Sequence, residues 1–158
     1  MKKLFTILML TPILLFGQNE QITKIDLAKN NIYAEAHLGL FTKVVMNYEW
    51  QIYSGEKVSW YGRLGGGWGF NGIDGLFDSY YGPGGLGAIT MLIGRNNNHF
   101  ELNTGAFIGN EQILRKGYGD TFLFPIINIG YRYQNPYGHI FRANVGYLSA
   151  GLSFGYAF

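Results

Sequence analysis

The last seven residues constrain the fold of this chain most strongly. Large apolar side chains at every second position alternate with small residues, giving Leu152, Phe154, Tyr156 and Phe158 on one side and Ser153, Gly155 and Ala157 on the other. Successive side chains of a β-strand point to opposite faces, so this period of two predicts an extended strand with one apolar face and one bare face.

Seven earlier segments show the same alternation of apolar and polar or small residues. They are 31–41, 44–54, 58–68, 84–94, 99–108, 122–134 and 139–148, and the alternation is least regular in 84–94. Each is about ten residues long, the length with which a tilted strand crosses a bilayer. No Asp, Glu, Lys or Arg falls on the apolar face of any of them. Pro125 has no N–H for a strand ladder, so we expect regular pairing of the sixth segment to begin after it.

The connections between the segments alternate in length. Tight turns are expected at 55–57, 95–98 and 135–138, long loops at 69–83 and 110–120, and short ones at 42–43 and 149–151. If the first strand rises from the periplasm, the tight turns are periplasmic and both long loops are external, which is typical of outer-membrane proteins. The sequence therefore predicts an all-β, eight-stranded antiparallel up-and-down transmembrane β-barrel over residues 31–158.

Composition favours a barrel in lipid over a soluble, lipocalin-like barrel, whose strands also alternate. The polar faces are rich in Gly, of which the chain has 24, whereas a water-facing surface would favour Lys, Glu, Thr and Ser. Crowding inside a barrel of eight strands selects small residues. Trp and Tyr lie on the apolar faces, several near strand ends, as interfacial aromatic girdles require. The chain has no Cys, which excludes a thiolate metal site.

The N-terminal residues read as a targeting segment. Lys2 and Lys3 precede the apolar run 4–16, which is short for a membrane span, so residues 1–17 are predicted to be a cleaved signal peptide. A signal anchor that stays in place is the alternative. Residues 18–30 are polar and are expected to form a short periplasmic lead-in. Removal of Lys2 and Lys3 leaves ten basic residues against ten acidic ones, so nothing points to a nucleic-acid partner.

The inward faces carry a set of charged and titratable residues, namely Glu35, His37, Glu49, Arg63, His99, Glu101, Arg132 and Arg142. A hairpin at 55–57 would pair Ser54 with Val58 and place Glu49 opposite Arg63, within reach of an ion pair. Charges in a narrow lumen must pair, because a lone buried charge costs several kcal/mol. We therefore expect a polar plug in the periplasmic half of the lumen. A gated ion path or a catalytic site is the functional alternative.

Signatures of catalysis and of ligand binding are weak. His99 and Glu101 share a face, but the next inward residue, Asn103, is not a nucleophile. The loop 69–83 has few oxygen ligands at calcium spacing. No catalytic, cofactor-binding or metal-binding residue is assigned, and no enzyme activity is expected.

The signal segment, the eight alternating segments and the final Phe158 together resemble the small outer-membrane barrels of Gram-negative bacteria, of the OmpX-like and OmpA transmembrane-domain-like kind. The resemblance covers about residues 31–158. The alternation at Leu152, Phe154, Tyr156 and Phe158 resembles the C-terminal assembly signal of such barrels.

This resemblance implies an outer-membrane location, with membrane lipid and the barrel-assembly machinery as partners. It also implies a structural or surface-interaction role, with any external protein or glycan bound through loops 69–83 and 110–120. Two other functions stay open: a lipid-modifying enzyme, such as a lipid A deacylase or acyltransferase, and a narrow channel or carrier of an apolar ligand.

Overall fold

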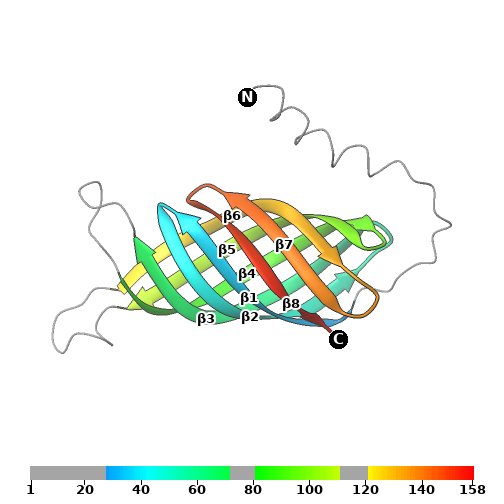
Figure 1. The fold of residues 1–158 in the computed structure, drawn as a ribbon, viewed down its shortest axis with the longest axis horizontal. Helices are drawn as coiled ribbons and strands as arrows, with labels where there is room; N and C mark the ends of the chain where they lie inside the picture. Colours follow the sequence, from blue (N-terminus) through cyan, green and yellow to red (C-terminus); the bar gives the residue numbers. More distant parts are fainter. Residues whose placement is uncertain (1–27, 72–80, 111–120) are drawn as a thin grey trace, which may run out of the picture.

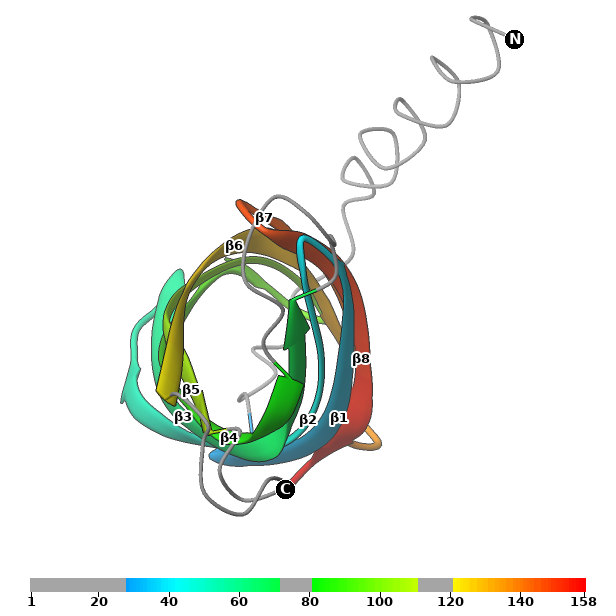
Figure 2. The same cartoon turned by 90° about the vertical axis from the view of Figure 1, so that its left-hand side faces the viewer.

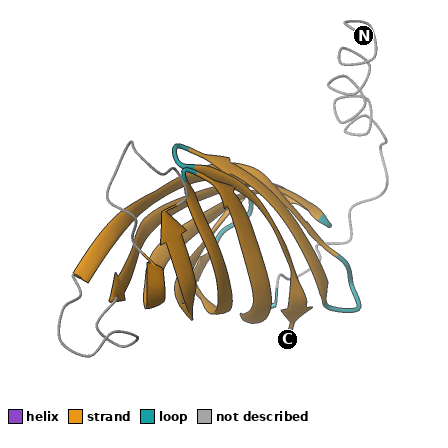
Figure 3. Ribbon diagram, turned by 60° about the vertical axis from the view of Figure 1, so that its left-hand side comes forward, coloured by secondary structure: helices purple, strands orange, loops and turns teal. Residues whose placement is uncertain are grey.

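The computed structural model describes residues 28–71, 81–110 and 121–158, and these residues form eight strands (Figure 3). The strands are β1 (Asn30–Gly39), β2 (Phe41–Ser54), β3 (Val58–Asn71), β4 (Tyr81–Arg95), β5 (Asn98–Asn110), β6 (Thr121–Gln134), β7 (His139–Gly146) and β8 (Ser149–Ala157). The predicted signal peptide, most of the lead-in 18–30, and residues 72–80 and 111–120 of the two long loops lie outside the described residues.

Each strand pairs with its sequence neighbours in antiparallel fashion, and β1 also pairs with β8, so the sheet closes into a barrel (Figures 1 and 2). Pairing between β1 and β8 runs from Asn31 opposite Ala157 to Gly39 opposite Ser149. Asn30 and Phe158 exchange two further backbone hydrogen bonds, of 2.8 and 3.0 Å. The predicted eight-stranded antiparallel up-and-down barrel is confirmed.

Side chains alternate between the two faces of the barrel wall as the sequence predicts. On the outer face Phe154 is 62% exposed and Ile127 is 63% exposed, whereas inward-facing Arg142 is fully buried. The four residues of the predicted C-terminal signal, Leu152, Phe154, Tyr156 and Phe158, are all exposed. The alternation sets the register, because a slip by one residue would turn every charge outward.

Several predicted strand ends are wrong. Residues 42–43 and 149–151, expected in loops, lie inside β2 and β8, and the connections at those points are Leu40 and residues 147–148. The strands β3 and β4 extend into the predicted loop 69–83, so that Phe70 lies opposite Tyr81. Short polar or Gly-containing stretches have the composition of turns, but here their backbone groups still form hydrogen bonds with the neighbouring strand, so they belong to the strands.

Pro125 does not delay the pairing of β6, contrary to expectation. The register with β5 runs through Ala106 opposite Pro125 and on to Asn110 opposite Thr121. On its other side, β6 pairs with β7 only from Asn128 onward, so residues 121–126 form an edge. An edge tolerates proline, because no neighbouring strand there requires its N–H.

The hairpin between β2 and β3 contains a β-bulge that the predicted register lacked. Gln51 lies opposite Tyr61 and Glu49 opposite Arg63, as expected, but the register shifts between Gln51 and Tyr53. Ser54 therefore lies opposite Ser59 and not Val58. A bulge inserts one extra residue into one strand and increases the local twist.

The end of the barrel that carries the long loops is filled by an apolar cluster, which the sequence did not predict. It consists of Phe41, Val45, Leu86, Phe107, Phe122 and Ile126, and Phe124 packs against it. The rings of Phe41 and Phe124 stack with centroids 4.0 Å apart. A Cβ on Gly84 would lie 2.6 Å from the Phe107 ring, so a glycine makes room for the cluster.

The rim at this end is uneven. Strands β7, β8 and β1 have 8, 9 and 10 residues, whereas β2 to β6 have 13 to 15. The β1–β2 and β7–β8 turns therefore stop short of the tips of β3 to β6 (Figure 1). The wall formed by β7, β8 and β1 is the low side of the rim.

Candidate functional site

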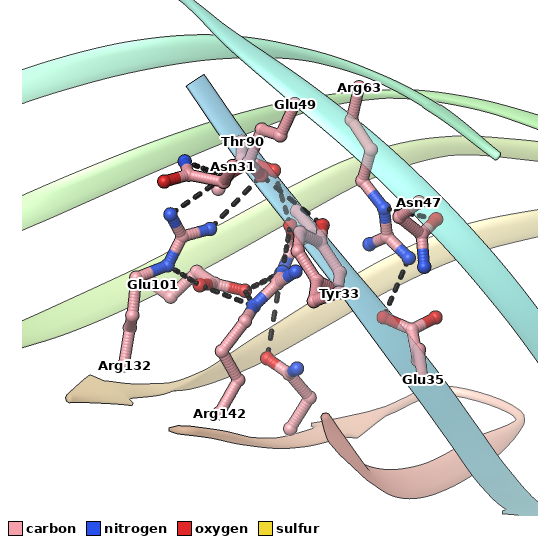
Figure 4. Close-up of polar contacts among 12 residues, drawn as sticks. Asn31, Tyr33, Glu35, Asn47, Glu49, Arg63, Thr90, Glu101, Arg132 and Arg142 are labelled. Carbon is pink, nitrogen blue, oxygen red and sulfur yellow. Dashed lines mark hydrogen bonds and ion pairs between the residues drawn. The ribbon is translucent and has the colours of Figure 1, made fainter. Parts of the chain in front are cut away.

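The structure places all eight side chains of the predicted polar network inside the barrel, none of them more than 3% exposed. They come from six strands: Glu35 and His37 from β1, Glu49 from β2, Arg63 from β3, His99 and Glu101 from β5, Arg132 from β6 and Arg142 from β7. Figure 4 shows the carboxylates and guanidiniums converging across the lumen.

One cluster of charges joins β2, β5, β6 and β7. Arg132 donates to both oxygens of Glu49, at 2.7 and 3.0 Å, and its Nε donates to Glu101 at 2.7 Å (Figure 4). Arg142 also donates to Glu101, its Nε lying 3.0 Å from Oε2. Bidentate arginine–carboxylate pairs fix orientation as well as charge, so this cluster locks four strands to one another.

A second cluster surrounds Glu35. Arg63 Nη2 lies 2.6 Å from Glu35 Oε2, and the Lys43 ammonium contacts Glu35 Oε1. The expected ion pair between Glu49 and Arg63 is wrong, although the two residues are opposite one another in the register. The guanidinium instead reaches past β2 to β1, because it is long enough to pass the neighbouring strand on the inner wall.

Two tyrosines line the charged region. The guanidinium carbon of Arg142 lies 4.2 Å from the centroid of the Tyr33 ring, and the guanidinium carbon of Arg63 lies 5.3 Å from the same centroid. Arg132 lies 5.6 Å from the Tyr61 ring centroid. Arginine stacks favourably on aromatic faces when both are desolvated. These contacts supply packing that an all-charged interior would lack.

Sequence reasoning missed several interior residues of this region, among them Tyr33, Lys43 and Ser149. Tyr33 follows the same parity as Glu35 and could have been found from it. Lys43 and Ser149 were assigned to loops, and parity within longer strands would have turned both inward. Both lie near strand ends beside the rim, where the sequence pattern predicts loops.

Ser149 joins the network through a histidine. The Oγ of Ser149 lies 3.1 Å from His37 Nδ1, and His37 Nε2 lies 3.5 Å from Glu35 Oε1. A serine, an imidazole and a carboxylate thus follow one another across β8 and β1. The other histidine of the polar network, His99, is buried near the tight turn between β4 and β5, and its Cα lies opposite that of Arg132.

Among the described residues, no group of three or more His, Asp or Glu side chains is placed to hold a metal ion. No helix long and apolar enough to cross a membrane occurs in the part of the chain that the structure describes.

Comparisons with models of known protein families, with curated proteins and with solved structures find no match to this chain. The chemistry of its own residues therefore has to support any assignment of function.

Proposed function

We propose that the protein is an integral outer-membrane β-barrel with a structural or surface-interaction role. The observation that carries this proposal is the distribution of polarity across the wall. Arg63, Arg132 and Arg142 are at most 1% exposed inside, whereas large apolar side chains on every strand face outward. In water this arrangement would expose a continuous apolar surface around the barrel, which water-soluble monomers rarely do.

The outer face has the character of a lipid-facing surface. No outward position in the described strands carries Asp, Glu, Lys or Arg short of the strand ends. Aromatic side chains flank the apolar band, with Trp50, Tyr53, Trp60, Tyr131 and Tyr133 toward the tight turns and Trp68, Tyr81 and Tyr147 toward the long loops. Such girdles mark the two membrane interfaces of outer-membrane barrels.

The filled interior supports a structural role over a pore. The charges around Glu49 and Glu101 lie in the lumen toward the tight turns. Those around Glu35, which include Lys43, lie nearer the long-loop end, and the apolar cluster around Phe41 fills that end. Eight strands enclose an interior only wide enough for side chains. Surface interaction would then use residues 72–80 and 111–120, which connect β3 to β4 and β5 to β6 at the same end of the barrel.

The proposal includes the route to the membrane. Residues 1–17 would be removed as a signal peptide, and β8 would present Leu152, Phe154, Tyr156 and Phe158 to the barrel-assembly machinery. The outward exposure of these four side chains supports that role.

Single-cysteine labelling tests the location, since the chain has no native Cys. Leu64→Cys places a thiol on the outer face of β3, and Glu56→Cys places one in the exposed β2–β3 turn. In permeabilised cells a water-soluble maleimide should label Glu56→Cys and leave Leu64→Cys unmodified until the protein is unfolded. Equal labelling of both, or recovery of the chain in the soluble fraction without detergent, would refute the membrane assignment.

A loop exchange separates the structural role from surface interaction. Residues 72–80 and 111–120 are each replaced by a short Gly-Ser turn, and the variant is expressed in a strain that lacks the protein. Restored resistance of the envelope to a dye or detergent indicates a structural role of the barrel itself. Failure to restore it, with a folded barrel in the membrane, indicates a function of the loops.

A further inference from the structure

We propose that Ser149, His37 and Glu35 form a hydrolytic site at the low side of the rim, which cleaves an ester-linked acyl chain from a membrane phospholipid. This activity is additional to the structural or surface role. It rests on the proposed membrane location only for the choice of substrate.

The three side chains have the order that nucleophilic catalysis requires. Ser149 Oγ is 3.1 Å from His37 Nδ1, within hydrogen-bond reach, and His37 Nε2 is 3.5 Å from Glu35 Oε1. With the proton on Nε2, the imidazole presents a lone pair to the hydroxyl and turns its N–H toward the carboxylate, with which it forms no hydrogen bond in this structure. The two ring nitrogens have exchanged the roles they play in serine proteases, and such sites are recognised by geometry and roles, not by sequence position. The longer His37–Glu35 distance is of the kind that tightens when substrate binds.

The carboxylate is held for this role. Arg63 and Lys43 both contact Glu35, which holds the carboxylate in place inside the barrel. The imidazole is also fixed, because it lies over Gly151, where an added Cβ would be 2.2 Å from the ring carbon Cδ2. Gly151 separates Ser149 from Ser153 on the same strand, and its lack of a side chain leaves the space that His37 fills.

Ser149 is accessible where the rest of the network is not. His37 and Glu35 are at most 1% exposed, whereas Ser149 is only partly buried at the first residue of β8. Its place on the low side of the rim lets a molecule lying against the outer wall reach over the edge of β8 and β1.

An apolar groove on the outer wall leads to this edge. It has a volume of about 820 Å³, and its lining includes Phe100, Ile129, Val145, Leu152, Ala150 and Leu38. Ala150 and Leu38 lie opposite one another, next to the pair Ser149 and Gly39. The groove is floored by small side chains, including Ala36 and Ala143, and its apolar lining suits a hydrocarbon chain. The groove ends beside Ser149, so one acyl chain of a lipid can lie in it while the ester of that chain reaches the rim. A phospholipid meets this requirement.

The reaction balances with water as the second substrate. Ser149 Oγ attacks the ester carbonyl while its proton passes to His37 Nδ1, and the carbon–oxygen bond to the glycerol breaks as that proton passes to the leaving oxygen. Water then attacks the acyl-serine, giving its proton to His37, and the fatty acid leaves as Ser149 regains a proton.

Labelling with a fluorophosphonate tests the site directly, because this probe reacts with activated serines. The folded full-length protein in detergent should be labelled at Ser149, as located by mass spectrometry of its peptides. Ser149→Ala should abolish the labelling, and His37→Gln should slow it about 100-fold or more, the usual contribution of a general base. Ser153→Ala is the matched control, since Ser153 also faces inward on β8 and should leave the rate unchanged.

Heat-dependent gel mobility shows that each variant is folded. A wild-type protein that is folded but not labelled at Ser149, or labelling at the same rate in His37→Gln, would overturn the site. A second arm incubates the protein with dioleoylphosphatidylglycerol vesicles or with lipopolysaccharide, and measures released fatty acid. Release from the vesicles that is lost in Ser149→Ala supports the substrate, whereas release from lipopolysaccharide alone, or from neither, overturns the phospholipid assignment.

Discussion

Arg63 illustrates how single residues behave inside a narrow barrel. Its Cα is opposite that of Glu49, yet its guanidinium bonds Glu35 at 2.6 Å and Asn47 at 3.0 Å. Glu49 instead accepts two hydrogen bonds from Arg132 and one, of 2.9 Å, from Asn31. Which residues face inward could be predicted from parity. Their partners could not, because a long side chain reaches past the neighbouring strand, and the residue that it meets there depends on the shear of the closed barrel.

A double-mutant cycle checks this pairing. Arg63→Met combined with Glu35→Gln should show a coupling energy of about 1–3 kcal/mol, because the two groups are in contact and buried. Arg63→Met combined with Glu49→Gln should show about 0.5 kcal/mol or less, since no direct bond joins them. The measurement is urea unfolding in detergent micelles or vesicles. Stronger coupling to Glu49 than to Glu35 would restore the pairing expected from the register.

At the scale of the strands, the sequence predicted the number, order and facing of the elements, because each carries its own alternation. It failed at their ends. Residues 42–43 and 149–151 resemble turns locally, and only pairing with a neighbouring strand makes them part of β2 and β8. The inward position of Ser149 could not be predicted for this reason, because a local sequence pattern contains no information on a hydrogen bond to a residue 112 positions away.

Inward-facing glycines set how closely the strands approach, and one substitution measures this. A Cβ on Gly67 of β3 would lie 2.0 Å from the carbonyl oxygen of Val44. One on Gly87 of β4, which faces outward, would meet no atom nearer than 3.9 Å. Gly67→Ala should therefore destabilise the barrel by about 1–3 kcal/mol, the usual effect of overpacking. Gly87→Ala, the control, should be neutral or slightly stabilising because alanine loses less backbone entropy on folding. Equal midpoints of urea unfolding would contradict this account.

At the scale of the whole molecule, the medium around the barrel determines which residues the outer face tolerates. A charge on the outer face is unfavourable in lipid and harmless in water. Ile129 lies in the middle of β6, between Leu102 and Val145, and is 49% exposed.

Replacing Ile129 by Arg should destabilise the folded barrel in vesicles by about 2–4 kcal/mol if this position lies near the bilayer midplane. Tyr137→Arg, in an exposed turn, should change stability by less than about 1 kcal/mol. Both are measured by reversible unfolding in vesicles. If Ile129→Arg is as stable as Tyr137→Arg, the outer face does not meet hydrocarbon.

The pairing of β1 with β8 has a kinetic consequence. The hydrogen bonds between Asn30 and Phe158 join the two ends of the described barrel, so the cylinder cannot close before β8 has been synthesised. Until then β1 offers an open edge with a row of unpaired amides, which invites aggregation. Because contacts between residues so distant in sequence form slowly, we expect this edge to be among the last parts of the barrel to become protected.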